Sequence, residues 1–169
     1  MAARSNSIRL TPTDSIAIRA FRELLRSYGL VERVMQPYFG RFGISGSQWG
    51  LLRNLHRAEQ EGRTGLRLSA LSERLLIRPP SVTGAVDRLE RAGLVARTSD
   101  PTDQRAKFVR LTAAGRKLVE NVLTAHEQQI EGVLSGLSVG DQTHLHRLLT
   151  RLVRHLEGLA DQHPLLLHE

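Results

Sequence analysis

A proline break at Pro79-Pro80 is the feature that most constrains the fold, because it separates two short amphipathic stretches. Ser69 to Leu76 lies before the break, and a second apolar stripe runs after it as far as Gly93. Proline restricts the residue before it to extended backbone but is tolerated in the first turn of a helix. The sequence therefore predicts two short helices joined by a tight turn. Their predicted inward-facing residues are Leu71 and Leu75 in the first helix, and Val82, Ala85, Val86 and Leu89 in the second.

Two strands are predicted directly after these helices. Leu94 to Thr98 and Ala106 to Leu111 have strand-like composition, and the residues between them contain Asp100-Pro101, a dipeptide that favours a turn. With a further short helix predicted at Gln48 to Arg57, the order is helix, helix, turn, helix, hairpin. This order describes a winged helix-turn-helix, so the predicted fold class is mainly α-helical with a small β-hairpin wing.

Long amphipathic helices are predicted on both sides of this unit. The first runs from Ser15 to Phe42, with a kink or an earlier end near Gln36 because Pro37 lies inside it. Two more follow the hairpin, one that ends at Gly136 and a strongly periodic last helix after it. N-terminal caps are predicted at Asp14, Ser47, Ser69, Thr112 and Ser138.

The positive charge of the chain is concentrated in one third of its length. Residues 63–117 hold twelve of the 24 Lys and Arg residues and five of the 17 Asp and Glu residues, so this segment carries the whole net charge of +7. Neutralising phosphates requires clustered cations, so the segment is predicted to bind a polyanion. A solvated basic face would carry the same charge, and charge alone does not separate the two.

Composition and spacing argue against several other classes of protein. The absence of cysteine excludes disulfides, thiolate metal sites and cysteine nucleophiles. There is no apolar run long enough to span a membrane and no signal-like start, so a cytoplasmic protein is expected. No catalytic or cofactor-binding motif is found, and His144 and His146 point to different helix faces. No enzyme activity, cofactor or metal is therefore expected.

The second of the paired helices is the expected DNA-reading element, because the major groove admits one α-helix. Ser81, Thr83 and Gly84 lie early on this helix, away from its apolar stripe, and are expected to face the bases. Arg78 and Arg88 are better suited to phosphates. Hydroxyls pair with any base and glycine specifies none, so direct readout is expected to be modest.

The same region resembles the multiple antibiotic resistance regulator (MarR) family of bacterial transcription factors. Four motifs carry the resemblance: a Val-Thr helix start, Asp-Arg-Leu before Gly-Leu-Val, an Asp-x-Arg wing and a Leu-Thr-x-x-Gly helix opening. In this chain they are Val82-Thr83, Asp87 to Leu89 with Gly93 to Val95, Asp103 to Arg105, and Leu111 to Gly115. Each motif is weak alone, but together and in this order they are specific, and they span roughly Leu68 to Lys117.

The resemblance implies roles for individual residues. Arg105 would enter the minor groove from the wing tip, with Asp103 orienting its guanidinium, a weakly hydrated planar group that suits a narrow A·T-rich groove. Thr83 would lie at the floor of the major groove and Arg88 on the DNA backbone. Arg97 and Lys107 complete the predicted DNA-binding set. Gly84 departs from the family, where a longer side chain often stands, so it weakens the expectation of base specificity there.

Family members are two-fold dimers built from their terminal helices, and the last helix here has a leucine stripe that fits such an interface. Periodicity does not name the partner, so the stripe fits either a dimer interface or an internal core. The predicted interface residues are Leu145, Leu148, Leu149, Leu152 and Leu156. The predicted division is a flexible arm (1–12), an N-terminal helix contributing to dimerisation (13–47), the winged helix-turn-helix domain (48–117) and C-terminal dimerisation helices (118–169).

The family often admits small aromatic acids between its dimerisation and DNA-binding lobes, which suggests a ligand pocket near the junction of the first two helices. The candidate ligand-binding residues are Tyr38, Phe42, Trp49, Arg53 and His56. Aromatic residues at helical spacing also fill cores, and the two polar residues are equally consistent with solvation.

These features predict a sequence-specific DNA-binding transcriptional regulator: a homodimeric repressor of a palindromic operator, released by a small aromatic or anionic ligand. The expected partners are double-stranded DNA carrying an inverted repeat, a second copy of the chain and a small-molecule effector, with no membrane. The alternative is a winged-helix interaction module whose basic face binds an acidic protein.

Overall fold

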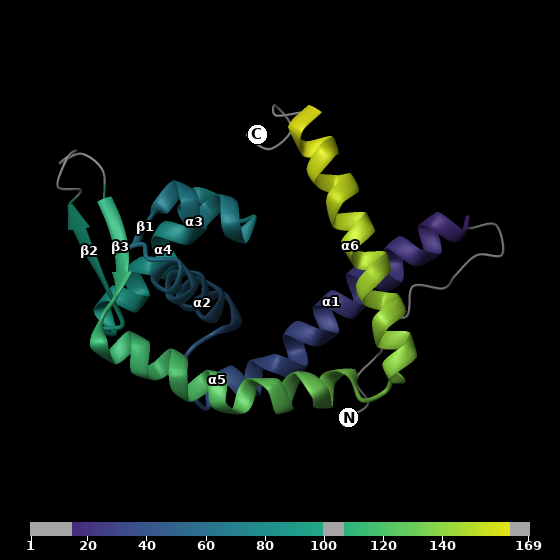
Figure 1. The fold of residues 1–169 in the computed structure, drawn as a ribbon, viewed down its shortest axis with the longest axis horizontal. Helices are drawn as coiled ribbons and strands as arrows, with labels where there is room; N and C mark the ends of the chain where they lie inside the picture. The colour runs from purple at the N-terminus through teal and green to yellow at the C-terminus, as the bar shows by residue number, and fades with distance from the viewer. Residues whose placement is uncertain (1–14, 100–106, 163–169) are drawn as a thin grey trace, which may run out of the picture. The chain divides into compact units, whose positions relative to one another are not determined.

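The computed structural model describes residues 15–99 and 107–162 (Figure 1). The predicted fold class is confirmed, since helices dominate and the two strands after the paired helices belong to a small antiparallel sheet. Residues 1–12, Asp14, Asp103 and Arg105 lie outside the described residues. The elements are α1 (Ile16–Gly40), α2 (Gly46–Gln60), β1 (Leu66–Arg67), α3 (Leu68–Leu75), α4 (Pro79–Arg91), β2 (Val95–Ser99), β3 (Lys107–Leu111), α5 (Ala113–Leu134) and α6 (Val139–Gln162).

The sheet has three antiparallel strands in the order β1-β3-β2. The predicted hairpin is present, from Val95 opposite Leu111 to Ser99 opposite Lys107. Sequence reasoning missed β1, which is two residues long and pairs Leu66 with Val109. Gly65 permits this pairing, because a Cβ there would lie 2.7 Å from the carbonyl oxygen of Val109. In this order, one edge of β2 has no partner among the described strands.

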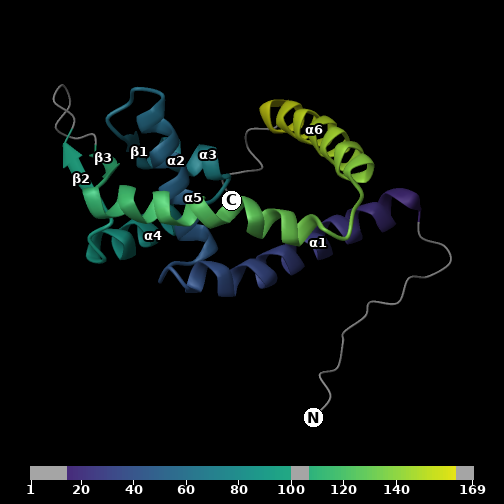
Figure 2. The ribbon, with the colours of Figure 1, turned by 60° about the horizontal axis from the view of Figure 1, so that its bottom comes forward.

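The chain divides into two compact units, one up to Ala125 and one from His126 onward. In the first unit the strands gather at one end, beside α4 (Figures 1 and 2). The inward stripe predicted for α4 is confirmed, as is Leu71, while Leu75 is half-buried. The fully buried side chains include Leu51, Leu52, Leu55, Leu71, Val82, Val86, Leu89, Val109, Val119 and Val122.

Of the two alternatives predicted at Pro37, a kink or an earlier end of the helix, the earlier end is wrong. The helix does not stop near Gln36 but continues through Pro37 to Gly40. Proline removes one helical hydrogen bond, but Met35, Tyr38 and Phe39 are buried around it, and this packing outweighs the loss. Burial of a helix's last turn can therefore override a local helix-breaking signal.

Three predicted caps are wrong and two are confirmed. The hydroxyl of Ser15, rather than the predicted Asp14, accepts from a first-turn N–H of α1. Ser45, not Ser47, caps α2 in a reciprocal box with Gln48. The residue before α3 is Arg67 rather than Ser69, because the pairing of β1 runs up to that point. The predicted caps Thr112 and Ser138 accept from the N–H groups of Gly115 and Asp141.

Candidate DNA-binding surface

Helix α4 separates a buried side from an exposed side. Arg78 is its N-cap, and prolines fill its first turn, where missing N–H groups cost nothing. Ser81, Thr83 and Arg88 are exposed and Gly84 is half-buried, which confirms that they lie away from the apolar stripe. Ser81, Thr83 and Arg88 therefore face away from the core of the protein.

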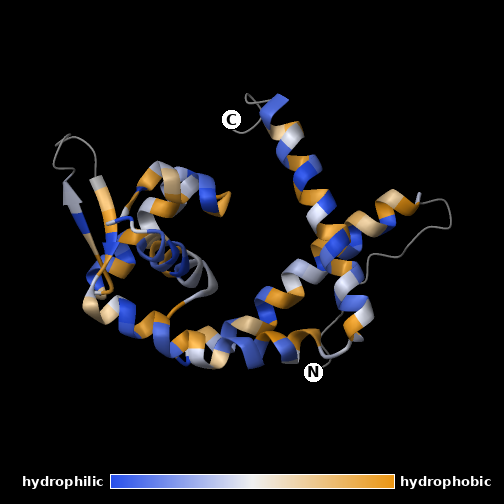
Figure 3. Ribbon diagram, in the orientation of Figure 1, coloured by the Kyte–Doolittle hydropathy of each residue, from blue (hydrophilic) through white to orange (hydrophobic). Residues whose placement is uncertain are grey.

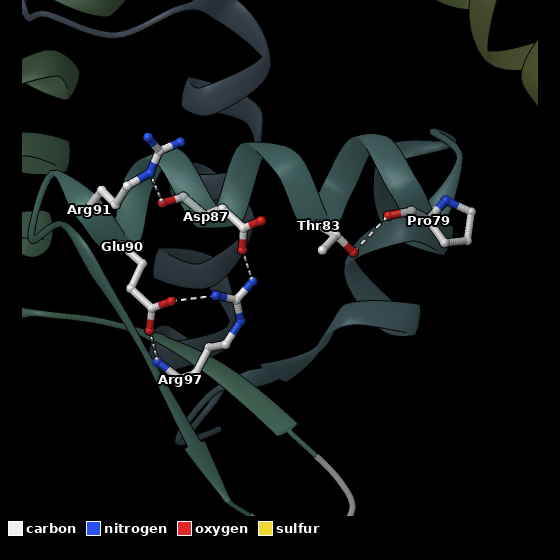
Figure 4. Close-up of polar contacts among 6 residues, drawn as sticks. All are labelled: Pro79, Thr83, Asp87, Glu90, Arg91 and Arg97. Atoms are coloured by element: carbon white, nitrogen blue, oxygen red, sulfur yellow. Dashed lines mark hydrogen bonds and ion pairs between the residues drawn. The ribbon is translucent and has the colours of Figure 1, made fainter.

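The hydroxyl of Thr83 is already used as a donor within the helix. It donates to the carbonyl oxygen of Pro79 at 3.1 Å, one turn earlier (Figure 4). What remains for an external partner is the acceptor capacity of the hydroxyl and the methyl group. An oxygen acceptor and a methyl group suit a base-edge amine and a thymine methyl, respectively.

Arg97 in β2 is bound to two carboxylates of α4 (Figure 4). One guanidinium nitrogen lies 2.5 Å from Asp87 Oδ1, and the other contacts Glu90 Oε2. The backbone N–H of Arg97 also donates to Glu90 Oε1 at 3.1 Å. The hydrogen bond to Asp87, and those to Glu90 after it, raise the pKa of Arg97, while burial opposes them. We call these three residues the clasp.

The base of the wing is fixed by a second set of bonds. Thr112 Oγ1 donates to the carbonyl oxygen of Gly93 at 2.7 Å, and the N–H of Thr112 donates to the carbonyl oxygen of Leu94 at 3.1 Å. A Cβ on Gly115 would lie 2.0 Å from that Leu94 oxygen, so only glycine fits. The Leu-Thr-x-x-Gly motif therefore joins the end of α4 to the start of α5.

The wing itself is only partly described. Lys107 begins β3 opposite Ser99, and its side chain lies outside the described residues. Arg110 is exposed on the same strand, and the guanidinium of Arg67 lies 5.5 Å from the ring centre of Phe108. The described part of the wing thus carries cations on its strands.

The predicted ligand-binding residues lie in packed surroundings. Tyr38 is 2% exposed, and its hydroxyl donates to the carbonyl oxygen of Val122 at 2.8 Å, linking α1 to α5. Burial raises the pKa of Tyr38, and the charge of Arg41 opposes this. The other candidates also have contacts within the chain: Phe42 packs edge-on against Tyr38, Trp49 stacks on Phe39, and Arg53 Nη1 lies 3.2 Å from His56 Nδ1.

Helix α6 carries hydrophobic residues along its length (Figure 3), and the side chains of its leucines are exposed in the single chain. The predicted interface residues are Leu145, Leu148, Leu149, Leu152 and Leu156, and each is at least 37% exposed. Helix α1 also exposes apolar residues, among them Phe21, Leu25, Tyr28 and Val34. Neither set is buried within the chain as described.

The described residues contain neither a metal-binding cluster nor a membrane span. No group of three His, Asp or Glu side chains there is placed to hold a metal ion. None of the described helices is both long and apolar enough to cross a membrane.

The sequence and fold match those of known transcriptional regulators. Residues 42–106 match the MarR family. The uncharacterized HTH-type transcriptional regulator YkoM of Bacillus subtilis is 33% identical over 149 residues, which cover 88% of this chain and 90% of the relative. The chain belongs to the MarR family. The homoprotocatechuate degradative operon repressor of Escherichia coli, another relative, is 31% identical over 134 residues, covering 78% of this chain and 83% of the relative.

Solved structures agree with this assignment. A probable transcriptional regulator from Pseudomonas aeruginosa has a TM-score of 0.70 at 27% identity, covering 82% of this chain and 97% of that one. A mutant of E. coli MarR complexed with operator DNA has a TM-score of 0.73 at 20% identity, covering 82% and 99%. This MarR-family protein is therefore a DNA-binding transcriptional regulator with a winged helix-turn-helix, in which α4 is the second helix and β2 and β3 form the wing.

Proposed function

We propose that this MarR-family regulator is a cytoplasmic repressor that binds a palindromic operator as a homodimer. The observation that carries the proposal is the two-sided character of α4: one side is buried in the core, and the other exposes Ser81, Thr83 and Arg88. An exposed helix side with short polar side chains fits the major groove, where base edges are read.

The contacts divide by chemistry. Ser81, Thr83 and Gly84 face base edges, where short side chains permit close approach. Arg78 and Arg88 bind phosphates on the flanks of the groove. From the wing, Lys107 binds the backbone and Arg105, oriented by Asp103, enters the adjacent minor groove.

Selection of genomic fragments by the purified full-length protein tests the proposal. The expected result is an enriched inverted repeat whose half-sites are about one helical turn apart, as two-fold symmetry requires. Arg88→Ala should weaken binding to all sequences alike, whereas Thr83→Ala should relax preference at one base pair. If no repeat is enriched, the operator hypothesis is lost, and binding to an acidic protein becomes the better explanation of the basic segment.

Dimerisation is supported by the exposed apolar residues of α1 and α6. Monomeric proteins rarely expose long contiguous apolar stripes, because burial of such surface is favourable. The double variant Leu148→Glu/Leu152→Glu should halve the mass measured by light scattering. Arg154→Glu, on the opposite side of the same helix, is the matched control and should leave the mass unchanged. If the leucine variant keeps the dimer mass, these leucines of α6 do not form the dimer interface.

Release by a small aromatic acid is the final part of the proposal. A solved structure of Bordetella bronchiseptica BpsR, 23% identical and with a TM-score of 0.71, concerns the regulation of that protein's DNA binding by 6-hydroxynicotinic acid. Tyr38, Phe42, Trp49, Arg53 and His56 are the proposed ligand-binding residues, with Arg53 meeting the carboxylate. A gel shift with 6-hydroxynicotinate and benzoate should show release, and Arg53→Gln should raise the concentration needed. If neither acid changes operator binding, release by a small aromatic acid is refuted, and the rest of the proposed function is unaffected.

A further inference from the structure

Strand β2, which leads to the wing tip, is attached to α4 through its backbone as well as through a side chain. Among the strands that the structure describes, β3 alone pairs with β2, which is therefore an edge strand. An edge strand presents N–H groups that no neighbouring strand accepts. The N–H of Arg97 is accepted by Glu90 Oε1 at 3.1 Å, so a side chain of α4 occupies this edge.

The side chain of the same residue makes a second attachment. Asp87 and Glu90 are three residues apart on α4, which places both carboxylates on one side of the helix. The planar fork of a guanidinium presents separate nitrogens to the two carboxylates in a fixed geometry, whereas an ammonium group is a single compact charge without such a fork. The Arg97 side chain is 24% exposed, compared with 48% for Asp87 and 38% for Glu90, so Arg97 is the most buried member of the clasp.

β2 is held at two points, by the bonds of Thr112 and by the clasp, and together they fix its direction as well as its position. The bonds of Thr112 hold the base of the wing at Gly93 and Leu94, and the clasp holds β2 a few residues further along. A strand held at one point can pivot, whereas a strand held at two points keeps its angle to the helix. The clasp is therefore placed to set the angle between the wing and α4.

We infer that Arg97 is a positioning residue of the DNA-binding surface, one that holds the wing at a fixed angle to α4 so that both engage DNA together. The inference rests on the proposed function and revises the sequence-based expectation that Arg97 itself contacts DNA. Preorganisation of this kind raises affinity because the wing need not be ordered when DNA binds.

Asp87→Asn distinguishes two possible roles of Arg97, binding a phosphate and positioning the wing, because the two roles predict opposite changes in operator affinity. If Arg97 binds a phosphate, Asp87→Asn frees its guanidinium and removes a negative charge, so affinity for the selected operator should rise. If Arg97 positions the wing, the same change loosens the clasp, and affinity should fall. Glu73→Gln on α3 removes an exposed carboxylate outside the clasp and measures the general effect of losing one negative charge.

A double-mutant cycle gives the second criterion. Arg97→Ala should weaken operator binding about tenfold, and Asp87→Ala together with Arg97→Ala should weaken it little further, since both break one clasp. Arg97→Lys should recover only part of the loss, because an ammonium lacks the fork. Additive losses, full recovery by lysine or tighter binding by Asp87→Asn than by Glu73→Gln would each overturn the inference.

Footprinting compares the protection of the minor groove with that of the major groove, and a general loss of stability would not change this ratio. Arg97→Ala should lose protection of the minor groove by the wing while keeping protection of the major groove by α4. Equal loss in both grooves would contradict the positioning role. Thermal unfolding of each variant verifies folding, and Asp87→Asn keeps the test decisive if Arg97→Ala does not fold. Wild-type protein that binds no specific DNA would instead refute the proposed function.

Discussion

Gly84→Ala should make the protein more stable and its DNA binding weaker. Gly84 lies inside α4, where glycine costs about 0.5–1 kcal/mol relative to alanine because it loses more backbone freedom on folding. A Cβ at this position would meet only Arg88 Nη1, at 3.7 Å, which is an ordinary contact with the mobile end of a long side chain. Nothing in residues 15–99 and 107–162 therefore requires glycine here.

The expected gain in the free energy of unfolding is the helix-propensity difference of about 0.5–1 kcal/mol, since no clash subtracts from it. For a chain of this size, such a gain raises Tm by about 1–4 °C. The cost should appear on DNA, where the added methyl group occupies space on the exposed side of α4. Overpacking typically costs about 1–3 kcal/mol, so the operator Kd should rise about fivefold or more.

Calorimetry and operator titration on the same preparation provide the assay. Gly132→Ala in α5 is the matched control, because a Cβ there meets no atom within 4 Å and the residue lies outside α4 and the wing. It should not change the operator Kd. If Gly84→Ala raises Tm and binds the operator as tightly as the wild type, glycine gives no clearance for DNA and the reasoning is refuted.

Three further substitutions test the local physics of the fold. Leu76 is 92% exposed and has φ +53°, a backbone conformation that costs a leucine about 1–2 kcal/mol. Leu76→Gly should therefore raise the Tm measured by calorimetry by a few degrees. A lower Tm would mean that the Leu76 side chain makes stabilising contacts despite its exposure. Gly115→Ala should reduce the free energy of urea unfolding by more than about 2 kcal/mol, because its Cβ would overlap the Leu94 oxygen; an unchanged midpoint would contradict that contact. Burial raises the pKa of Tyr38, so the tyrosine ionises first in the unfolded chain and the free energy of unfolding decreases as pH rises above 10. In urea titrations, Tyr38→Phe should lower the free energy of unfolding by about 1 kcal/mol at neutral pH, because the hydrogen bond to Val122 is lost. The same variant should show a smaller decrease in stability at alkaline pH.

The paired helices could be predicted because their signals are local. The proline break, the apolar stripe of α4 and the hydroxyl caps before α5 and α6 act within a few residues of one another. Strand β1 could not be predicted, since two residues hold no period and the strand exists only by pairing with β3. The cap at Ser45 was recognisable, because Ser45 and Gln48 have the Ser-x-x-Gln spacing of a capping box and Ser47 has no Glu or Gln three residues later.

The clasp shows why the site was only partly predictable. Asp87 and Glu90 stand at a spacing that places two carboxylates on one side of a helix, and this was visible in the sequence. Their partner could not be identified, because Arg97 reaches them only after β2 packs beside α4. Charge counts treat every cation as equivalent, whereas packing decides which ones face water.

The salt dependence of operator binding measures how many cations are free for phosphates. In the described part of residues 63–117, four arginines already pair with carboxylates: Arg63 and Arg74 with Glu61, Arg97 with the clasp acids, and Arg116 with Glu59. At most eight of the segment's twelve cations then remain for each protomer. The slope of log K against log salt should be no steeper than about −7 per protomer, at about −0.9 for each phosphate neutralised. Exposed pairs are weak enough for phosphates to displace, so a steeper slope would mean that these pairs open on DNA.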